Sequence, residues 1–198
     1  MAEHYFTADP STTATQRELR VRIAGEDYRF TTAAGTFSGD RLDLGTSVLL
    51  ARGPDPLGGR LLDLGCGWGP VAVSLARRVP AATVWAVDVN RRALGLAGRN
   101  AAAAGVADRV RVAEPDEVPT GLSFDAIWSN PPIRVGKSEL HALLLRWLPR
   151  LAPEGTAWLV VARHLGADSL ADWLGEQGFP TRRHASAKGY RVLAVTHR

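Results

Sequence analysis

The stretch that decides the fold lies at residues 61–70 and reads Leu61-Leu62-Asp63-Leu64-Gly65-Cys66-Gly67-Trp68-Gly69-Pro70. Its apolar beginning predicts a short buried strand. Three glycines at alternate positions let the backbone turn sharply and approach a ligand closely. The proline suits the first turn of a helix, where a missing N–H group costs nothing. We therefore interpret the stretch as a strand, a glycine loop and the start of a helix whose free N–H groups face a ligand.

Strand and helix patterns alternate from this stretch to the end of the chain. Strands are predicted at residues 61–64, 83–89, 110–112, 124–129, 156–162, 181–185 and 190–196. Helices are predicted at residues 71–79, 91–104, 138–151 and 168–177, the last with Asp168 as its N-cap. This order predicts a Rossmann-like α/β fold, with a mostly parallel seven-stranded sheet and helices on both faces. One strand must run antiparallel, because too few residues join the last two for a crossover.

The beginning of the chain has a different pattern. Residues 19–23 and 28–32 alternate apolar and polar side chains, and Gly25-Glu26-Asp27 offers a turn between them. This predicts a β-hairpin with one solvent-exposed face that carries arginines. We expect an N-terminal extension at residues 1–45, packed on a main domain at residues 46–198.

Composition excludes several classes of protein. Of 198 residues, 45% are hydrophobic and 22% are charged, which is too apolar for a disordered chain. Cys66 is the one cysteine, which excludes a disulfide framework and a multi-cysteine metal site, and the five histidines show no ligand spacing. We therefore expect no bound metal. No signal peptide and no apolar run long enough for a membrane span is present, so a soluble, cytoplasmic protein is expected.

Two acidic residues near the glycine loop restrict the class of ligand that the loop can bind. The spacing G-x-G-x-G differs from the dinucleotide fingerprint G-x-G-x-x-G. The Asp63 carboxylate is unfavourable beside a pyrophosphate but favourable near an ammonium group. Asp88 follows 19 residues past Gly69 and can accept hydrogen bonds from both ribose hydroxyls, or it can cap the next helix, where Asn90 is also available. For Cys66 a buried small side chain is a better interpretation than a nucleophile, since nothing nearby favours a thiolate.

The strand at residues 124–129 ends in Asn130-Pro131-Pro132-Ile133. Two prolines cannot continue a central strand, so they fix the backbone as it leaves the sheet. The amide oxygen of Asn130 and the carbonyl of Pro131 can accept two hydrogen bonds from one planar –NH₂ group and orient its lone pair. Asn-Pro is also a common turn, but its place at a strand end beside the glycine loop favours the functional interpretation.

Together these motifs resemble those of the class I methyltransferases, which bind S-adenosylmethionine (SAM), and of the amino-methyltransferases with an (Asn/Asp/Ser)-Pro-Pro-aromatic motif. Further segments resemble the small-domain methyltransferases, which include the 16S ribosomal RNA guanine-N2 methyltransferases and shorter archaeal relatives. These segments are His4-Tyr5-Phe6, Gly35-Thr36-Phe37-Ser38, Leu42-Asp43-Leu44-Gly45-Thr46, Ile133-Arg134-Val135-Gly136-Lys137 and Gly189-Tyr190-Arg191-Val192. The resemblance covers nearly the whole chain.

The resemblance implies roles for particular residues. Cofactor contacts are expected from Asp63, Gly65, Cys66, Gly67, Gly69, Asp88, Val89, Asp116 and Asn130, with Asp116 (or Glu114) at the adenine. The catalytic motif is Asn130, Pro131, Pro132 and Ile133, and substrate contacts are expected from Phe37, Arg134 and Lys137. Many relatives have an aromatic residue at the position of Ile133, which would stack on a flipped base. Tyr5, Phe6 or Phe37 is an alternative source of stacking.

Exposed cations are the candidate contacts to RNA phosphates. Besides Arg134 and Lys137, they form two groups, Arg17, Arg20, Arg22 and Arg29 near the start and Arg182, Arg183, His184, Lys188 and Arg191 near the end. The net charge is only +4, and edge strands often carry charges simply to prevent pairing, so solvated faces are the alternative.

The resemblance implies a SAM-dependent methyltransferase that acts on an exocyclic amine of RNA, with guanine N2 of 16S ribosomal RNA as the expected target. RNA or the small ribosomal subunit is the expected partner. The larger bacterial members carry an additional N-terminal domain, for which we expect no room in these 198 residues, so the RNA target need not be the same. Two alternatives stay open. One is N-methylation of a protein glutamine or a small-molecule amine, and the other is a non-catalytic module that binds RNA.

Overall fold

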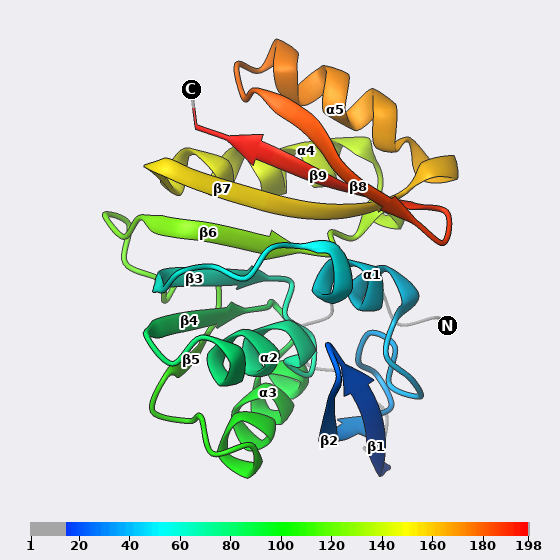
Figure 1. Ribbon diagram of the computed structural model, residues 1–198, viewed down its shortest axis with the longest axis vertical. Coiled ribbons are helices and arrows are strands. Elements are labelled where there is room, and N and C mark those ends of the chain that lie inside the picture. The colour runs from blue at the N-terminus through cyan, green and yellow to red at the C-terminus, as the bar shows by residue number, and fades with distance from the viewer. Residues whose placement is uncertain (1–14, 198) are drawn as a thin grey trace.

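A seven-stranded sheet forms the centre of the protein in the computed structural model, which describes residues 15–197 (Figure 1). The strand order is β5-β4-β3-β6-β7-β9-β8. The strands are β3 (Gly59–Leu64), β4 (Ala82–Val87), β5 (Val110–Ala113), β6 (Phe124–Ser129), β7 (Leu151–Ala162), β8 (Thr181–Ala187) and β9 (Tyr190–Thr196). Strand β9 pairs antiparallel with β7 and β8, and all other pairs are parallel. This confirms the predicted Rossmann-like fold and its one antiparallel strand.

Helices cover both faces of the sheet (Figure 1). The helices are α1 (Leu44–Arg52), α2 (Pro70–Arg78), α3 (Arg91–Ala103), α4 (Lys137–Trp147) and α5 (Ala167–Glu176). Two hydrophobic clusters lie on opposite sides of the sheet, one beneath α1, α2 and α3 and the other beneath α4 and α5. The alternating strand residues supply both clusters, as expected for strands buried on both faces.

Some boundaries differ from the prediction. Helix α1 was not predicted. Asp168 is not the N-cap of α5, because Gly166 takes that position and the Asp168 carboxylate forms an ion pair with Arg191. The helix predicted to reach residue 151 ends at Trp147, where a short 3-10 turn with Pro149 leads into β7. A proline cannot donate the next helical hydrogen bond.

An N-terminal β-hairpin forms a separate two-stranded sheet from β1 (Gln16–Ile23) and β2 (Glu26–Ala33). Its turn lies at Ala24-Gly25, both with positive φ, so Glu26 and Asp27 belong to β2 rather than to the predicted turn. Asn100 of α3 holds the hairpin through the backbone N–H (2.7 Å) and carbonyl (2.9 Å) of Thr31. The hairpin is therefore fixed to the α3 side of the sheet.

Within residues 15–197, none of the helices has both the length and the apolar character that a membrane span requires.

Candidate active site

The glycine loop leaves β3 and is tied to the neighbouring strand. The backbone N–H groups of Gly65 and Cys66 both donate to the Val87 carbonyl, at 2.8 and 3.0 Å. Gly67 has φ +54° and a Cβ atom built there would meet no atom within 4 Å, so the space above this residue is open. At Gly69 a Cβ would lie 3.0 Å from the Cβ of Ala97, which explains the close approach of α2 to α3. One glycine thus faces open space and another permits helix packing.

Asp63 lies inside the protein beneath the glycine loop. Only 2% of the residue is exposed, and its carboxylate accepts the Ala72 N–H of α2 at 2.9 Å. Burial raises its pKa to about 8, and the nearby Asp88 carboxylate adds to this while the Ala72 N–H opposes it. A positive charge placed beside this carboxylate would stabilise its ionised form.

This raised pKa predicts a pH-dependent stability. The folded-state pKa lies above the ordinary value of 3.8, so the contribution of Asp63 to stability is complete below about pH 4 and lost as the pH rises through about 8. The free protein should therefore lose stability from pH 5 to 9, and Asp63→Asn should show a smaller loss. Thermal unfolding of both proteins at each pH measures this difference. Equal loss of stability in the two proteins would contradict it.

Asp88 begins the loop after β4 and holds the glycine loop from the other side. Its two oxygens accept the backbone N–H groups of Gly67 and Asn90, each at 2.9 Å. Burial raises the pKa of this carboxyl group, and these N–H groups oppose the rise. The helix-capping role considered for Asp88 belongs to Asn90, whose side chain accepts the Ala93 N–H.

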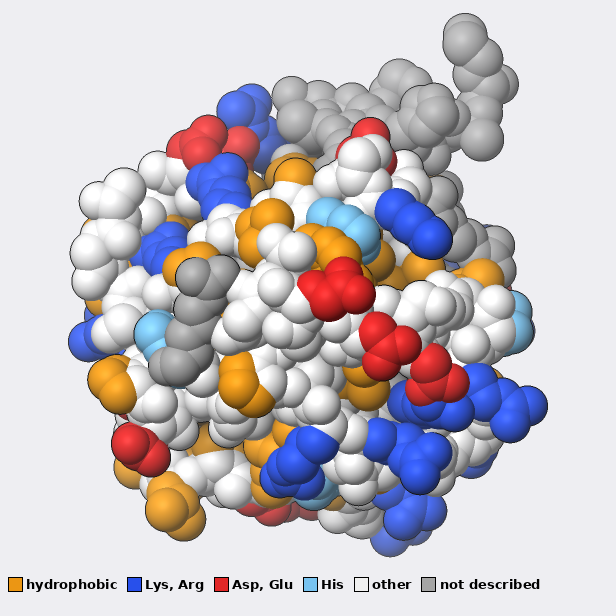
Figure 2. Space-filling model, turned by 90° about the horizontal axis from the view of Figure 1, so that it is seen from above, with side chains coloured by type: hydrophobic (Ala, Val, Ile, Leu, Met, Phe, Trp, Pro, Cys, Tyr) orange, Lys and Arg blue, Asp and Glu red, His pale blue; other side chains and the backbone are white. Residues whose placement is uncertain are grey.

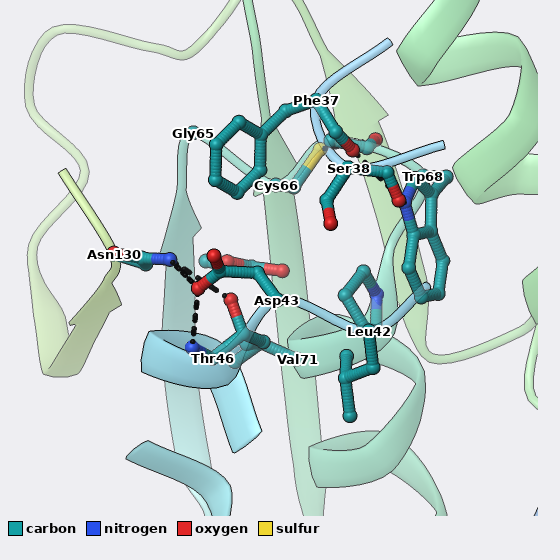
Figure 3. Close-up of a pocket in the computed structure, with 13 residues that line it drawn as sticks. Phe37, Ser38, Leu42, Asp43, Thr46, Gly65, Cys66, Trp68, Val71 and Asn130 are labelled. Carbon is teal, nitrogen blue, oxygen red and sulfur yellow. Dashed lines mark hydrogen bonds between the residues drawn. The ribbon is translucent and has the colours of Figure 1, made fainter. Parts of the chain in front are cut away.

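Two pockets open on either side of Gly65. The loop pocket lies toward α1 and α2, and Figure 3 shows its lining side chains; those used below are Phe37, Asp43, Thr46, Asp63, Gly67 and Asn130. The strand pocket lies at the ends of β3 and β4 and is almost entirely apolar; its lining residues are Leu64, Gly65, Val87, Asp88, Val89, Pro115, Pro132 and Leu143. A ligand with a polar end and an apolar ring can span both pockets across Gly65.

The Asn-Pro-Pro motif leaves β6 beside the glycine loop. The Ser129 hydroxyl donates to the Leu64 carbonyl at 2.7 Å and so joins the ends of β6 and β3. The Ile133 N–H donates to the Pro131 carbonyl at 2.9 Å, across Pro132 with φ −75° and ψ 77°, which is an inverse γ-turn. The Pro131 oxygen keeps a second lone pair, because a carbonyl oxygen can accept two hydrogen bonds.

The Asn130 side chain meets two residues of the α1 start, as Figure 3 shows. Its Nδ2 donates to Asp43 Oδ2 at 2.7 Å and to Thr46 Oγ1 at 3.1 Å. Asp43 is also the N-cap of α1 and accepts the Thr46 N–H at 3.0 Å. Neither Asp43 nor Thr46 has a role predicted from the sequence. The sequence signal that points to this helix start is an N-cap residue type, Asp43, directly before the apolar residues of α1.

Of the remaining residues predicted to contact the cofactor, some line the two pockets and one does not. Val89 lines the strand pocket, and Cys66 is buried in the loop pocket. Burial raises the pKa of the Cys66 thiol, which agrees with a small buried side chain rather than a nucleophile. Asp116 lines neither pocket; its side chain is 93% exposed and forms an ion pair with Arg146 at 2.7 Å. Pro115 lines the strand pocket in that region instead.

The predicted substrate residues lie around the two pockets and beside a third cavity. The Phe37 ring lines the loop pocket, and its carbonyl accepts the Trp68 indole N–H at 3.1 Å. Ile133 and Lys137 line a cavity of about 480 Å³ between α4 and α5, where His141 stacks on Trp173. The Arg134 side chain and the segment His4-Tyr5-Phe6, with its proposed stacking residues, lie outside the described part of the chain.

The predicted cation groups are mostly exposed. Arg20, Arg22 and Arg29 lie on the exposed face of the hairpin, whereas Arg17, although exposed, shares the other face with Leu19 and Val21. Arg182, Arg183, His184 and Lys188 lie on the edge strand β8 and its turn. Figure 2 views the molecule from the side of α5, β8 and β9, and it shows Lys and Arg side chains gathered toward one end of that surface. Arg191 differs from the others of its group because it pairs with Asp168. Both groups could therefore meet an anionic partner.

Comparisons with known proteins agree on one family. The family model described as methyltransferase small domain matches residues 27–194. The Bacillus subtilis protein YbxB is 32% identical over 197 residues, which cover 98% of this chain and 98% of YbxB. Ribosomal RNA small subunit methyltransferase C of Hahella chejuensis is 38% identical over 156 residues, 76% of this chain and 44% of that protein.

A solved structure is similar over almost the whole chain. The 16S rRNA N2 G1207 methyltransferase RsmC of T. thermophilus, in complex with AdoMet and guanosine, matches with a TM-score of 0.80 and 26% identity. The match covers 96% of this chain and 52% of that chain. The chain therefore spans about half the length of the two ribosomal RNA methyltransferases that it resembles.

Proposed function

The chain belongs to the methyltransferase small domain family, as the resemblance of its motifs predicted, and we propose that it methylates the N2 amine of a guanine in 16S ribosomal RNA with SAM as the cofactor. The observation that carries this proposal is the Asn130-Pro131 acceptor pair, held beside the glycine loop by the Ser129–Leu64 hydrogen bond. The similar T. thermophilus enzyme binds AdoMet and guanosine, which supports the choice of cofactor and base.

The residues present fit SAM. The open space above Gly67 leaves room for a ligand against the backbone, and Asp63 in the loop pocket suits the ammonium group of the methionine end. Asp88 suits the ribose, and the apolar wall of Val89, Pro115 and Leu143 suits the adenine ring. When bound, SAM supplies an electrophilic methyl group on a sulfonium centre.

The Asn-Pro-Pro motif holds the acceptor. The Asn130 Oδ1 and Pro131 carbonyl oxygens accept the two hydrogens of the amine, so that its lone pair points to the cofactor side. Positioning is then the main catalytic device. No general base is required, because the amine can release a proton to water after the new bond forms. We propose that Ile133 and the cavity between α4 and α5 shape the entry of the nucleotide, with Lys137 near its phosphate.

The packing of Gly45 against this motif predicts an effect on activity. A Cβ at Gly45 would lie 2.9 Å from Asp43 Oδ2, 2.9 Å from Tyr190 Cε1 and 3.3 Å from Asn130 Nδ2. Gly45→Ala should therefore displace the Asn130 amide and lower turnover about tenfold, since small misplacements are costly in catalysis. Alanine itself favours a helix, so weakening of α1 is not the cause.

The matched control for this variant is Gly95→Ala in α3, where a Cβ meets no atom within 4 Å. Steady-state kinetics of the two variants measure the difference. Wild-type turnover in Gly45→Ala would contradict the proposed arrangement.

Nucleoside mass spectrometry on RNA from the source organism, with and without the gene, tests the proposed function. Loss of N2-methylguanosine from small-subunit RNA would support it. Loss of a different methylated base would keep the amine chemistry and correct the target. An unchanged RNA nucleoside profile would reject RNA as the acceptor, in favour of a protein glutamine or a small-molecule amine.

A further inference from the structure

The hydrogen bonds of the Asn130 amide are the unexplained feature of the site. Both hydrogens of Nδ2 are used, one by Asp43 Oδ2 at 2.7 Å and one by Thr46 Oγ1 at 3.1 Å. Among the described residues no donor occupies Oδ1, and Asn130 lines the loop pocket. The amide oxygen is thus the edge of the group that remains for an acceptor amine.

An asparagine amide has two edges of almost the same shape, so something must decide which edge faces the pocket. A hydroxyl such as that of Thr46 can donate or accept, and it would pair with either edge. An ionised carboxylate only accepts. Asp43 is therefore the partner that requires Nδ2 of Asn130 to face it, which leaves Oδ1 of Asn130 facing the pocket.

The start of α1 holds Asp43 in place. As the N-cap residue it accepts the Thr46 N–H at 3.0 Å through the same Oδ2 that accepts from Asn130. Gly45 lets Asn130 and Tyr190 approach it closely. The helix start thus sets the position of a carboxylate directly behind the amide.

We propose that Asp43 is a positioning residue that acts through Asn130. It fixes the amide oxygen toward the acceptor amine and, through the polarised amide, stabilises the positive charge that the amine acquires. That charge arises because the nitrogen lone pair forms the new N–C bond while the electrons of the C–S bond leave with sulfur, and one proton then passes from nitrogen to water. The proposal rests on the proposed function, since it needs an amine as the acceptor.

Asp43→Asn separates this role from helix capping. Asparagine caps helices as well as aspartate does, so α1 should persist. The new amide can donate as well as accept, so it no longer prevents Asn130 from turning its nitrogen to the pocket. We expect kcat to fall at least about tenfold, with the SAM dissociation constant within about twofold of wild type. Thr46→Val, which keeps the Asp43 carboxylate, should lower kcat less than about threefold.

A double-mutant cycle shows whether Asp43 acts through Asn130. In an Asn130→Ala background the added Asp43→Asn change should alter kcat less than about twofold, because the group it orients is gone. The same tenfold loss in both backgrounds would overturn the proposal and leave Asp43 a structural residue only.

The Asn130 side-chain amide gives a readout that does not depend on turnover. In ¹⁵N-labelled protein its resonances are those missing from Asn130→Ala. The two hydrogens should exchange with water more slowly than those of the exposed Gln16, and faster in Asp43→Asn than in wild type. Exchange as fast as that of Gln16 in the wild-type protein would refute the network. A wild-type protein that transfers no methyl group to RNA would instead refute the proposed function, and the exchange comparison would still decide the network.

Discussion

Replacing Asn130 with alanine is expected to lower the rate of methyl transfer at least about 100-fold, while the affinity for SAM stays within about threefold of wild type. The variant removes the amide oxygen that we propose faces the acceptor, and with it one of the two proposed hydrogen bonds that orient the amine lone pair. The glycine loop, Asp63 and Asp88 keep their own hydrogen bonds, which do not involve Asn130. The variant should therefore lose methyl transfer while it keeps SAM binding.

Single-turnover transfer from tritiated SAM and calorimetry of SAM binding measure the two quantities. Gln16→Ala, which removes an exposed amide on the hairpin, is the control and should behave as wild type. Transfer by Asn130→Ala within threefold of wild type would show that the Asn-Pro-Pro motif is only a turn.

Asp88→Asn is expected to weaken SAM binding at least about tenfold, which corresponds to about 1.4 kcal/mol. The carboxylate accepts two backbone N–H groups and Asp88 lines the strand pocket, so both the glycine loop and the proposed ribose contact depend on it. An amide at this position presents an –NH₂ group where an acceptor is required. Asp172→Asn, on the exposed surface of α5, changes the charge equally and should have no effect.

A ligand analogue separates the two functions of Asp88. Wild-type protein should bind S-adenosylhomocysteine more tightly than its 2′-deoxy form, and Asp88→Asn should lose most of this preference. Calorimetry with both ligands measures it. A preference that persists in the variant would mean that Asp88 supports the glycine loop without contacting the ribose.

Local patterns predicted the parts of the fold that local physics determines. The alternate glycines, the proline after them and the Asn-Pro-Pro segment each restrict their own backbone, so the loop and the strand end could be placed from the sequence. The antiparallel strand followed from the short connection at Lys188-Gly189, which the β8–β9 pairing confirms.

The features that the sequence patterns did not predict depend on contacts between residues far apart in the sequence. Asp116 lines neither pocket and instead pairs with Arg146, 30 residues away on α4. Asp168 pairs with Arg191 instead of capping α5. The approach of Asp43 to Asn130 joins residues 87 positions apart, and no spacing rule reports it. Such partners become visible only when the sheet order is known.

The most direct test of the proposed function is methyl transfer to small-subunit RNA from SAM with a deuterated methyl group, followed by nucleoside mass spectrometry. Unmodified RNA and subunits from a strain without the gene are the two substrates, and Asn130→Ala is the control. We expect labelled N2-methylguanosine with wild-type protein on at least one substrate, and at most a hundredth of it with the variant. No label in guanosine on either substrate, with SAM bound, would contradict the account.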